Sequence, residues 1–181
     1  MKIADVIQIV DNLQVNIFET EDKLRWCYEV TTDILSDCPV YRSMTQKVPY
    51  DGCVVALPDG VQFSQVVKVC VNGKLCPLLD ERTVEDTVLK KGDEVYVVYR
   101  AVPEVYELND GVIPEEYETV CPAPWDAMYV DYVCAQMAYH QNDLSDYEKY
   151  IHTYNVRFES YKKWFLSNSP ISDRKNFVNL Y

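Results

Sequence analysis

Hydrophobic residues in the C-terminal part of the chain recur at spacings of three and four, which predicts two long helices. The first begins after two closely spaced prolines. The second begins at Ser145, where Glu148 three residues later completes a capping-box pattern. A short polar connector at 140–144 predicts that the two helices lie antiparallel. The helix pair at 124–167 is therefore expected to be the element around which the chain is organised.

A shorter amphipathic pattern opens the chain. Residues 3–13 place their apolar side chains on one side of a predicted helix. After a linker at 14–19, a second helix is expected to begin near Thr20, which would be its cap, with Glu21 and Asp22 in its first turn, and to end before Pro39. These two helices and the later pair would form a bundle of two antiparallel helix pairs.

Between the helical segments the pattern changes to that of β-strands. Residues 63–71 and 74–79 flank Asn72-Gly73, the preferred dipeptide of a two-residue hairpin turn. Counting outward from this turn, Cys70 faces Leu75 and Val69 faces Cys76. Because side chains alternate faces along a strand, Cys70 and Cys76 fall on opposite faces and should not form a disulfide.

Further β-structure is expected on both sides of this hairpin. A strongly β-prone strand is predicted over 94–101, a further strand over 53–57 and a short strand within 40–48, with one or two helical turns over 83–89. The sequence thus predicts an α+β fold, a helical bundle with an inserted small antiparallel β-sheet and an extended C-terminal tail. It is interpreted as one domain over 1–181, with helices at 1–37, the insertion at 40–101, a connector at 102–123, the long helix pair at 124–167 and the tail at 168–181.

The stripe on the long helix pair is aromatic, which leaves two interpretations. It can be an ordinary buried core stripe, or some tyrosines can reach past the core to a neighbouring subunit, because tyrosine combines an apolar ring with a polar end. The candidate inter-subunit residues are Tyr129, Tyr132, Tyr147, Tyr150, Tyr154 and Tyr161.

Charge narrows the classes of partner. The net charge of −12 argues against binding nucleic acid by phosphate neutralisation, which needs clustered lysine and arginine. The connector is acidic and is interpreted as a solvated edge or as a channel wall that DNA passes without adhering. Its acidic residues are Glu104, Glu107, Asp110, Glu115, Glu116 and Glu118.

Candidate chemistry is scarce. Seven cysteines are scattered without C-x-x-C spacing, and only His140 and His152 could join them as soft metal ligands. No catalytic or phosphate-binding signature occurs. We therefore expect no enzyme activity, no metal site and no cofactor. No apolar run is long enough to cross a bilayer, and Asp5 lies where a secretion signal would be apolar, so a cytosolic site of synthesis is expected.

The last fourteen residues have few packing partners of their own, yet they include several apolar side chains. Such a tail is expected to dock onto its own bundle or onto a neighbouring subunit. Its candidate docking residues are Pro170, Ile171, Phe177, Val178, Leu180 and Tyr181.

The order of elements resembles the head–tail connector (adaptor) proteins of tailed bacteriophages. The resemblance covers nearly the whole chain and depends on this order together with short signatures. The signatures are Glu21-Asp22-Lys23-Leu24-Arg25-Trp26, Val71-Asn72-Gly73-Lys74, Pro114-Glu115-Glu116-Tyr117, Tyr129-Val130-Asp131-Tyr132 and Tyr147-Glu148-Lys149-Tyr150.

The resemblance implies a structural role in the virion neck. Adaptors assemble as a ring, commonly a dodecamer, beneath the portal protein, where they extend the DNA channel and provide a platform for tail proteins. Double-stranded DNA would pass through without specific binding, no membrane would be involved, and the tail at 168–181 would grip the portal or a neighbour. Two alternatives stay open: another neck or tail-completion protein of the virion, and a cytosolic α+β binding module.

Overall fold

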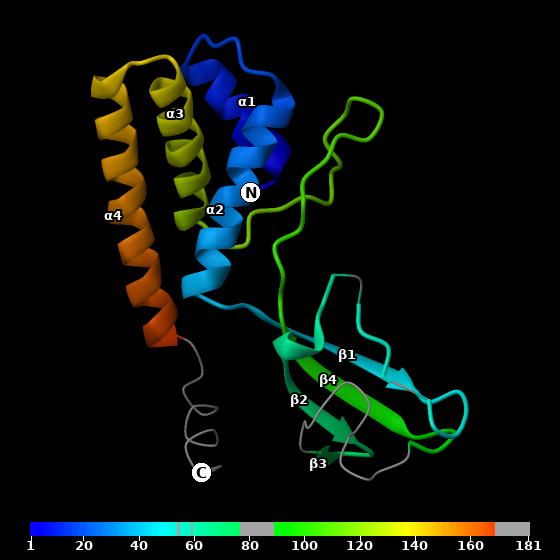
Figure 1. The fold of residues 1–181 in the computed structure, drawn as a ribbon. Coiled ribbons are helices and arrows are strands. Elements are labelled where there is room, and N and C mark those ends of the chain that lie inside the picture. The colour runs from blue at the N-terminus through cyan, green and yellow to red at the C-terminus, as the bar shows by residue number, and fades with distance from the viewer. Residues whose placement is uncertain (54, 59, 77–88, 169–181) are drawn as a thin grey trace. The chain divides into compact units, whose positions relative to one another are not determined.

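A computed structural model describes residues 1–53, 55–58, 60–76 and 89–168. It contains four helices and a small four-stranded antiparallel sheet, which confirms the predicted α+β class (Figure 1). The chain divides into two compact units. A helical unit comprises Met1–Cys38 and Glu104–Tyr181, and a sheet unit comprises Pro39–Pro103. The sheet unit is thus inserted between two segments that fold together.

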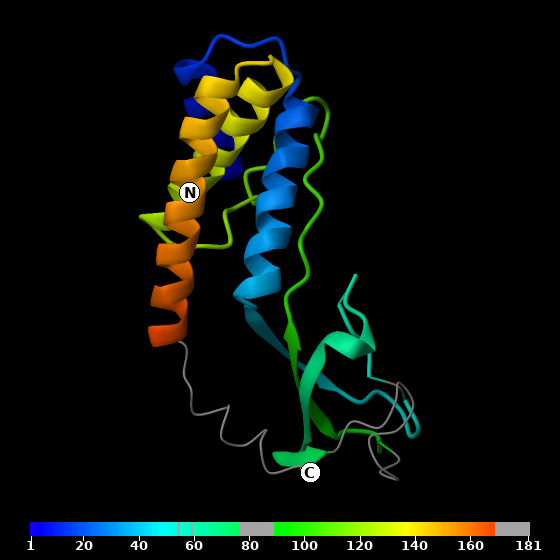
Figure 2. The same cartoon turned by 60° about the vertical axis from the view of Figure 1, so that its left-hand side comes forward.

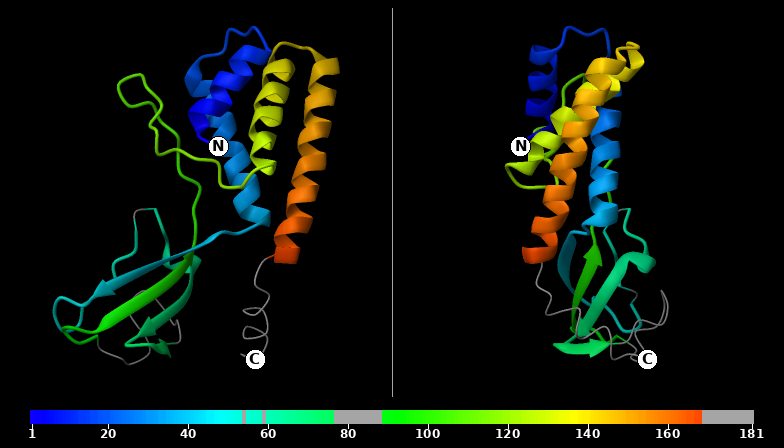
Figure 3. Two further views of the ribbon diagram at one scale, coloured as in Figure 1. Left: turned by 180° about the vertical axis from the view of Figure 1, so that it is seen from behind. Right: turned by 90° about the vertical axis from the view of Figure 1, so that its left-hand side faces the viewer.

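The helical unit is arranged around its third helix. Helix α3 lies between α4 on one side and α1 and α2 on the other (Figure 3), and nine of its residues are buried. A short 3₁₀ helix, η2, leads into it. The bounds are α1 Ile3–Leu13, α2 Thr20–Asp37, η2 Trp125–Ala127, α3 Met128–His140 and α4 Leu144–Asn168. As predicted, α3 and α4 run antiparallel through a short turn (Figure 1).

The predicted helix starts need two corrections. Helix α4 begins at Leu144, and its first turn is capped by Asp143, whose Oδ1 accepts a hydrogen bond from the Asp146 N–H at 3.1 Å. The Ser145 capping box is therefore wrong, because an aspartate two residues earlier already satisfies a free N–H of the first turn. Thr20 is the first residue of α2 and does not cap it. Glu19 takes the capping position without a side-chain bond.

The core of the helical unit combines aliphatic and aromatic side chains. Each of the four helices contributes, and aromatic residues of the segment before α3 complete it. Trp26 of α2 is almost fully buried. Its ring stacks on that of His140 at the end of α3, with 5.6 Å between centroids.

The sheet unit places its last strand inside the sheet. The strands are β1 Tyr41–Lys47, β2 Val66–Val71, β3 Lys74–Cys76 and β4 Glu94–Arg100. Their spatial order is β1-β4-β2-β3, and all neighbours are antiparallel. Strand β4 therefore lies between β1 and the β2–β3 hairpin. The sheet thus depends on pairing between strands that are distant in the sequence.

The hairpin register is the one predicted. Val71 pairs with Lys74, Cys70 with Leu75, and Val69 with Cys76. Asn72 and Gly73 both have positive φ values, 48° and 77°, as a two-residue hairpin turn requires. Cys70 and Cys76 are free thiols on opposite faces, as expected.

Valines form most of the sheet core. Val69, Val71, Val95 and Val97 share the buried face, and the segment before β2 covers part of it. The predicted strand at 53–57 is wrong over its described residues. Cys53, Val55 and Leu57 lie in irregular backbone, where they pack as partly buried side chains against the core. Their apolar run reflects burial without pairing. Positions 83–88 of the predicted helical turns and 77–79 of the predicted hairpin strand lie outside the described residues.

None of the helices in the described part of the chain combines the length and the apolar character needed to span a membrane.

Candidate functional site

Three of the six tyrosines expected to face another subunit are buried inside the helical unit. Tyr129, Tyr154 and Tyr161 are each less than 5% exposed. A side chain enclosed by its own fold has no surface to offer a neighbour, so the prediction is wrong for these three. The aromatic stripe is, for them, the ordinary core stripe that the sequence left open as an alternative.

The Tyr129 hydroxyl belongs to a buried hydrogen-bond network. Thr31 Oγ1 lies 2.7 Å from Tyr129 Oη and 2.9 Å from Tyr106 Oη, and it donates to the Cys27 carbonyl at 3.0 Å. If both tyrosines donate to Thr31, every hydroxyl proton has an acceptor. Burial raises the pKa of Tyr106 to about 12 and that of Tyr129 well above its usual value. The network therefore stays neutral and is structural.

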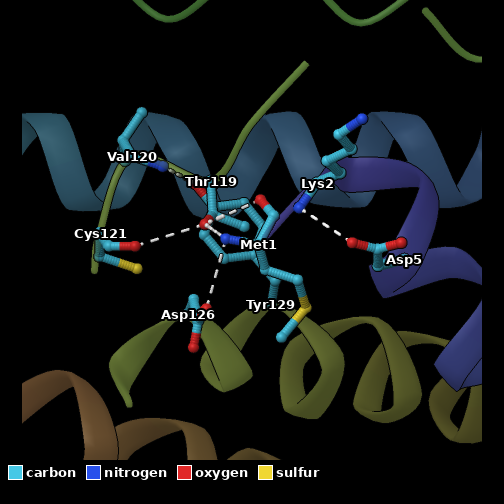
Figure 4. Close-up of polar contacts among 8 residues, drawn as sticks. All are labelled: Met1, Lys2, Asp5, Thr119, Val120, Cys121, Asp126 and Tyr129. Atoms are coloured by element: carbon cyan, nitrogen blue, oxygen red, sulfur yellow. Dashed lines mark hydrogen bonds and ion pairs between the residues drawn. The ribbon is translucent and has the colours of Figure 1, made fainter. Parts of the chain in front are cut away.

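The beginning of α1 is attached to the start of α3 (Figure 4). The Met1 amino group lies 3.4 Å from Asp126 Oδ2 and donates to Thr119 Oγ1 at 3.2 Å, while the Thr119 N–H donates to the Met1 carbonyl at 3.0 Å. Close by, the Val120 N–H donates to Tyr129 Oη at 3.4 Å. These bonds join the connector to the helices.

An acidic stripe on α2 accepts hydrogen bonds from two tyrosines of the aromatic stripe and pairs with one lysine of α4. Glu29, Asp33 and Asp37 recur every four residues, so they share one helix face. Tyr132 Oη donates to Glu29 at 2.9 Å, Tyr154 Oη donates to Asp33 at 3.4 Å, and Lys162 pairs with Asp37 at 3.4 Å. Burial raises the pKa of both tyrosines. These hydroxyls are therefore used within the unit.

Tyr132, Tyr147 and Tyr150 are half-buried. The Tyr147 ring lies 5.5 Å from that of Tyr139, and the Lys149 ammonium lies 4.9 Å above the Tyr150 ring. Their predicted contact with another subunit stays a prediction.

The acidic side chains of the connector are exposed. All six of its predicted residues are solvent-exposed, and one of them, Glu115, forms an ion pair with Lys2 at 3.3 Å. Exposure agrees with a solvated edge, and the channel-wall interpretation stays a prediction. Two apolar side chains, Val105 and Val112, are exposed among these acids. The tail residues predicted to dock lie outside the described residues.

Two of the buried thiols are poorly suited to nucleophilic chemistry. Burial raises the pKa of Cys121 and Cys134 to about 12, so these thiols are protonated and poorly nucleophilic at neutral pH. His140 packs against aromatic rings, and His152 is exposed. Among the described residues, no group of three or more His, Cys, Asp or Glu side chains could hold a metal ion.

The most conspicuous surface lies at one end of the helical unit, which we call the bundle end. Both helix–helix connections, α1–α2 and α3–α4, lie there in every view (Figures 1–3). Phe18 of the first connection contacts the His140 ring at the end of α3, with 6.1 Å between centroids. The exposed apolar residues of the bundle end are Leu13, Val15, Ile17, Tyr139 and Leu144.

The α1–α2 linker holds two of its apolar side chains outward by specific bonds. Asn16 Nδ2 donates to Asp11 at 2.9 Å and to the Gln14 carbonyl at 3.0 Å, and Asn16 Oδ1 accepts from the Phe18 N–H. Phe18 packs edge-on against Trp26. With Asn16 and Phe18 fixed to the unit, Val15 and Ile17 point away and are 99% and 88% exposed. The sequence showed these residues in a linker, but only the alternation of Val15, Asn16, Ile17 and Phe18 signalled their orientation.

A second surface is the open face of the sheet. Since Val95, Val97 and Tyr99 of β4 point to the core, Tyr96, Val98 and Arg100 point to the other side. The strand register places Cys70 beside Tyr96, Lys68 beside Val98, and Leu75 beside Cys70. Leu75 is 67% exposed, and Lys68 and Arg100 are exposed as well. The same face carries Lys47 and Glu94, which are partners in the strand register. With Lys47, Lys68 and Arg100 against Glu94 among its described side chains, the open sheet face is apolar and basic overall.

Charge is divided unequally between the units. The sheet unit has eight basic and eight acidic residues, whereas the helical unit has nine basic and 21 acidic residues. The whole net charge of −12 thus belongs to the helical unit. The sequence argument from charge therefore applies to that unit, and the sheet unit has to be considered on its own.

No known family model matches the chain, and no curated protein is significantly similar to it.

Proposed function

We propose that this protein is a structural assembly component, a head–tail adaptor of a tailed-bacteriophage virion. Copies of the chain form a ring under the portal, commonly twelve-fold in the adaptor family, which extends the DNA channel and receives tail proteins. The proposal assigns the chain no catalytic step. It places the protein in the virion neck after assembly in the bacterial cytoplasm.

The observation that carries the proposal is the outward presentation of Val15 and Ile17. Exposed single apolar residues are ordinary on protein surfaces. Here, however, two almost fully exposed β-branched side chains are held by a linker that hydrogen bonds have fixed in place. Apolar side chains that hydrogen bonds hold in an exposed position are typical of a surface that contacts another protein. The resemblance in element order supports the specific choice of an adaptor.

Size-exclusion chromatography with and without the purified portal ring of the same phage tests the proposal. The full chain should co-migrate with the portal ring, and electron micrographs should show added density at one end of it. Failure of the full chain to co-migrate would contradict the proposed function.

A variant ending at 167 separates the role of the tail from the role of the fold. It should retain its helical circular dichroism but lose portal binding, because the apolar tail is the expected grip. A truncated chain that still binds the portal would remove the tail from the mechanism while leaving the adaptor function in place.

A further inference from the structure

We infer that the bundle end of one copy docks onto the open sheet face of the next copy, so that the chain associates head to tail. The inference deepens the proposed function, on which it rests, by naming the two surfaces that would join neighbouring subunits. The two surfaces belong to different units of the chain, so contact between them in successive copies is heterologous, the type of interface that generates rings when the rotation closes.

Apolar character is the first point of correspondence. The bundle end exposes Val15, Ile17 and Leu13, and the open sheet face exposes Leu75 and Tyr96 beside the half-buried Cys70 and Val98. Tyr96 lies between Cys70 and Thr45 in the strand register, so Leu75, Cys70 and Tyr96 form a continuous row across the sheet. An exposed pair of β-branched side chains and an apolar row across a sheet are both surfaces that lose contact with water on association.

Charge is the second point of correspondence, and it indicates that the partner of each surface is the other surface on a second copy of the chain. The bundle end carries Glu19, Glu21 and Asp143, none of which forms an ion pair with a described residue. On the open sheet face, Lys68 and Arg100 are equally without an ionic partner in the described part of the chain. Opposite unpaired charge beside each apolar patch favours this pairing and disfavours contact of either surface with itself.

The partition of charge between the units points the same way. Two helical units repel each other, because all of the net negative charge belongs to them. A neutral sheet unit with a basic face is the part of a neighbouring copy that a helical unit can approach without this repulsion. Head-to-tail contact therefore places unlike units together at every junction.

Complementation between two defective variants tests the inference. Val15→Asp with Ile17→Asp disables the bundle end, and Lys68→Glu with Arg100→Glu disables the sheet face. All four side chains are exposed, so both variants should fold, which circular dichroism checks. In sedimentation velocity over a concentration series at low salt, the wild-type chain should self-associate. Each variant should self-associate more weakly than the wild type, by a factor of about ten or more.

The mixture of the two variants gives the decisive result. Each variant retains the surface that the other lacks, so an equimolar mixture should form a heterodimer and no larger species. Added salt should dissociate it. A wild-type chain that stays monomeric throughout the series, or a mixture that does not associate, would overturn the inference.

Matched controls identify the surface. Val112→Asp changes a valine that is exposed on the acidic connector, and Val156→Asp changes one that is exposed on α4. Neither should alter self-association, and a loss in the Val112 variant would transfer the contact to the connector and overturn the assignment. Fluorescence anisotropy with a labelled single-stranded oligonucleotide adds a second test. Binding that requires Lys68 and Arg100 would assign the sheet face to nucleic acid instead of to a second copy.

The portal experiment stays separate from this one. If the two variants complement each other but the wild-type chain does not join a portal ring, the adaptor function is refuted and the interface is retained. A chain that joins the portal ring while the two variants fail to complement would do the reverse.

Discussion

The core of the helical unit and the core of the sheet unit are built from different kinds of side chain. The helical core contains tyrosines whose hydroxyls are bonded to Thr31 and to the carboxylates of α2, whereas the sheet core is mostly valine. Buried polar groups stabilise a fold only when each one finds its partner. The helical unit therefore specifies its packing by hydrogen bonds as well as by shape, and the sheet unit relies on shape and strand pairing.

The same difference extends to the surface. The helical unit bears the net charge of −12 and the apolar bundle end, while the sheet unit is neutral overall. An average over the whole chain conceals both facts. Composition is informative about a partner only when it is assigned to the part of the fold that meets the partner.

The largest expected effect on stability lies in the helical core. Tyr129→Ala should lower the free energy of unfolding by about 3–5 kcal/mol, because it leaves a cavity and removes a hydrogen-bond partner of Thr31. Urea unfolding followed by tryptophan fluorescence measures it, since all three tryptophans belong to the helical unit. Tyr139→Ala, at a residue that is 54% exposed, should change stability by less than about 0.5 kcal/mol. Equal effects would contradict the buried network.

A core truncation in the sheet unit should have a smaller effect. Val97→Ala removes two methyl groups from a fully buried position, which should cost about 2 kcal/mol. Amide hydrogen exchange should show the loss in β2 and β4, and the tryptophan fluorescence midpoint should move less. Equal shifts of the two signals would show that the units unfold as one.

Two of the glycines, one in each unit, offer a matched pair. Gly73→Ala in the sheet unit and Gly111→Ala in the helical unit both place a side chain at a φ near +77°, with no nearby atom in its way. Each should cost about 1 kcal/mol from backbone strain alone. Hydrogen exchange should detect the first and tryptophan fluorescence the second. A larger cost at Gly73 would mean that the hairpin turn contributes more than its local strain.

The smallest effect distinguishes the units by its sign. Burial, and then repulsion by Asp37 and Glu29, raises the pKa of Asp33, so its charged form opposes folding. Hydrogen bonds from the Lys90 N–H and the Asn72 amide lower the pKa of Asp93, so its charged form favours folding. At pH 7, Asp33→Asn should therefore stabilise the protein and Asp93→Asn should destabilise it.

Thermal unfolding across a pH series separates the two carboxylates further. The gain from Asp33→Asn should shrink as the pH falls through the raised pKa of the folded state, because the wild-type carboxyl then loses its charge. The cost of Asp93→Asn should persist down to the usual value of 3.8 and then disappear as the pH falls through the lowered pKa. Effects of the same sign at pH 7 would refute the contrast.

The sequence predicted the elements whose signals are local. Asn72-Gly73 determined the hairpin register, and the spacing of Ile3, Val6, Ile7 and Val10 determined α1, because turn chemistry and helical periodicity act over a few residues. The strand predicted at 53–57 failed because an apolar run indicates burial without indicating a hydrogen-bonding partner.

The candidate surfaces were harder to predict because they depend on contacts between distant segments. Tyr129 and Tyr147 have the same side chain on neighbouring helices, yet Tyr129 is buried beside Thr31 and Tyr106, whereas Tyr147 is only half-buried. Val15 and Ile17 are exposed because Asn16 and Phe18 turn inward toward Asp11 and Trp26. Periodicity cannot supply such partners, which belong to other elements.

The sheet unit lies in the sequence between the two segments of the helical unit. This order determines which unit can complete its folding first during synthesis. The sheet unit ends at Pro103, so its central strand β4 and both of that strand's partners have been synthesised before any residue of α3 exists. Helices α1 and α2 must wait for α3 to cover their apolar faces. A nascent chain whose synthesis has passed Pro103 but has not reached Met128 would thus combine a complete sheet with two helices whose apolar faces are uncovered. This species is the one most in need of a chaperone.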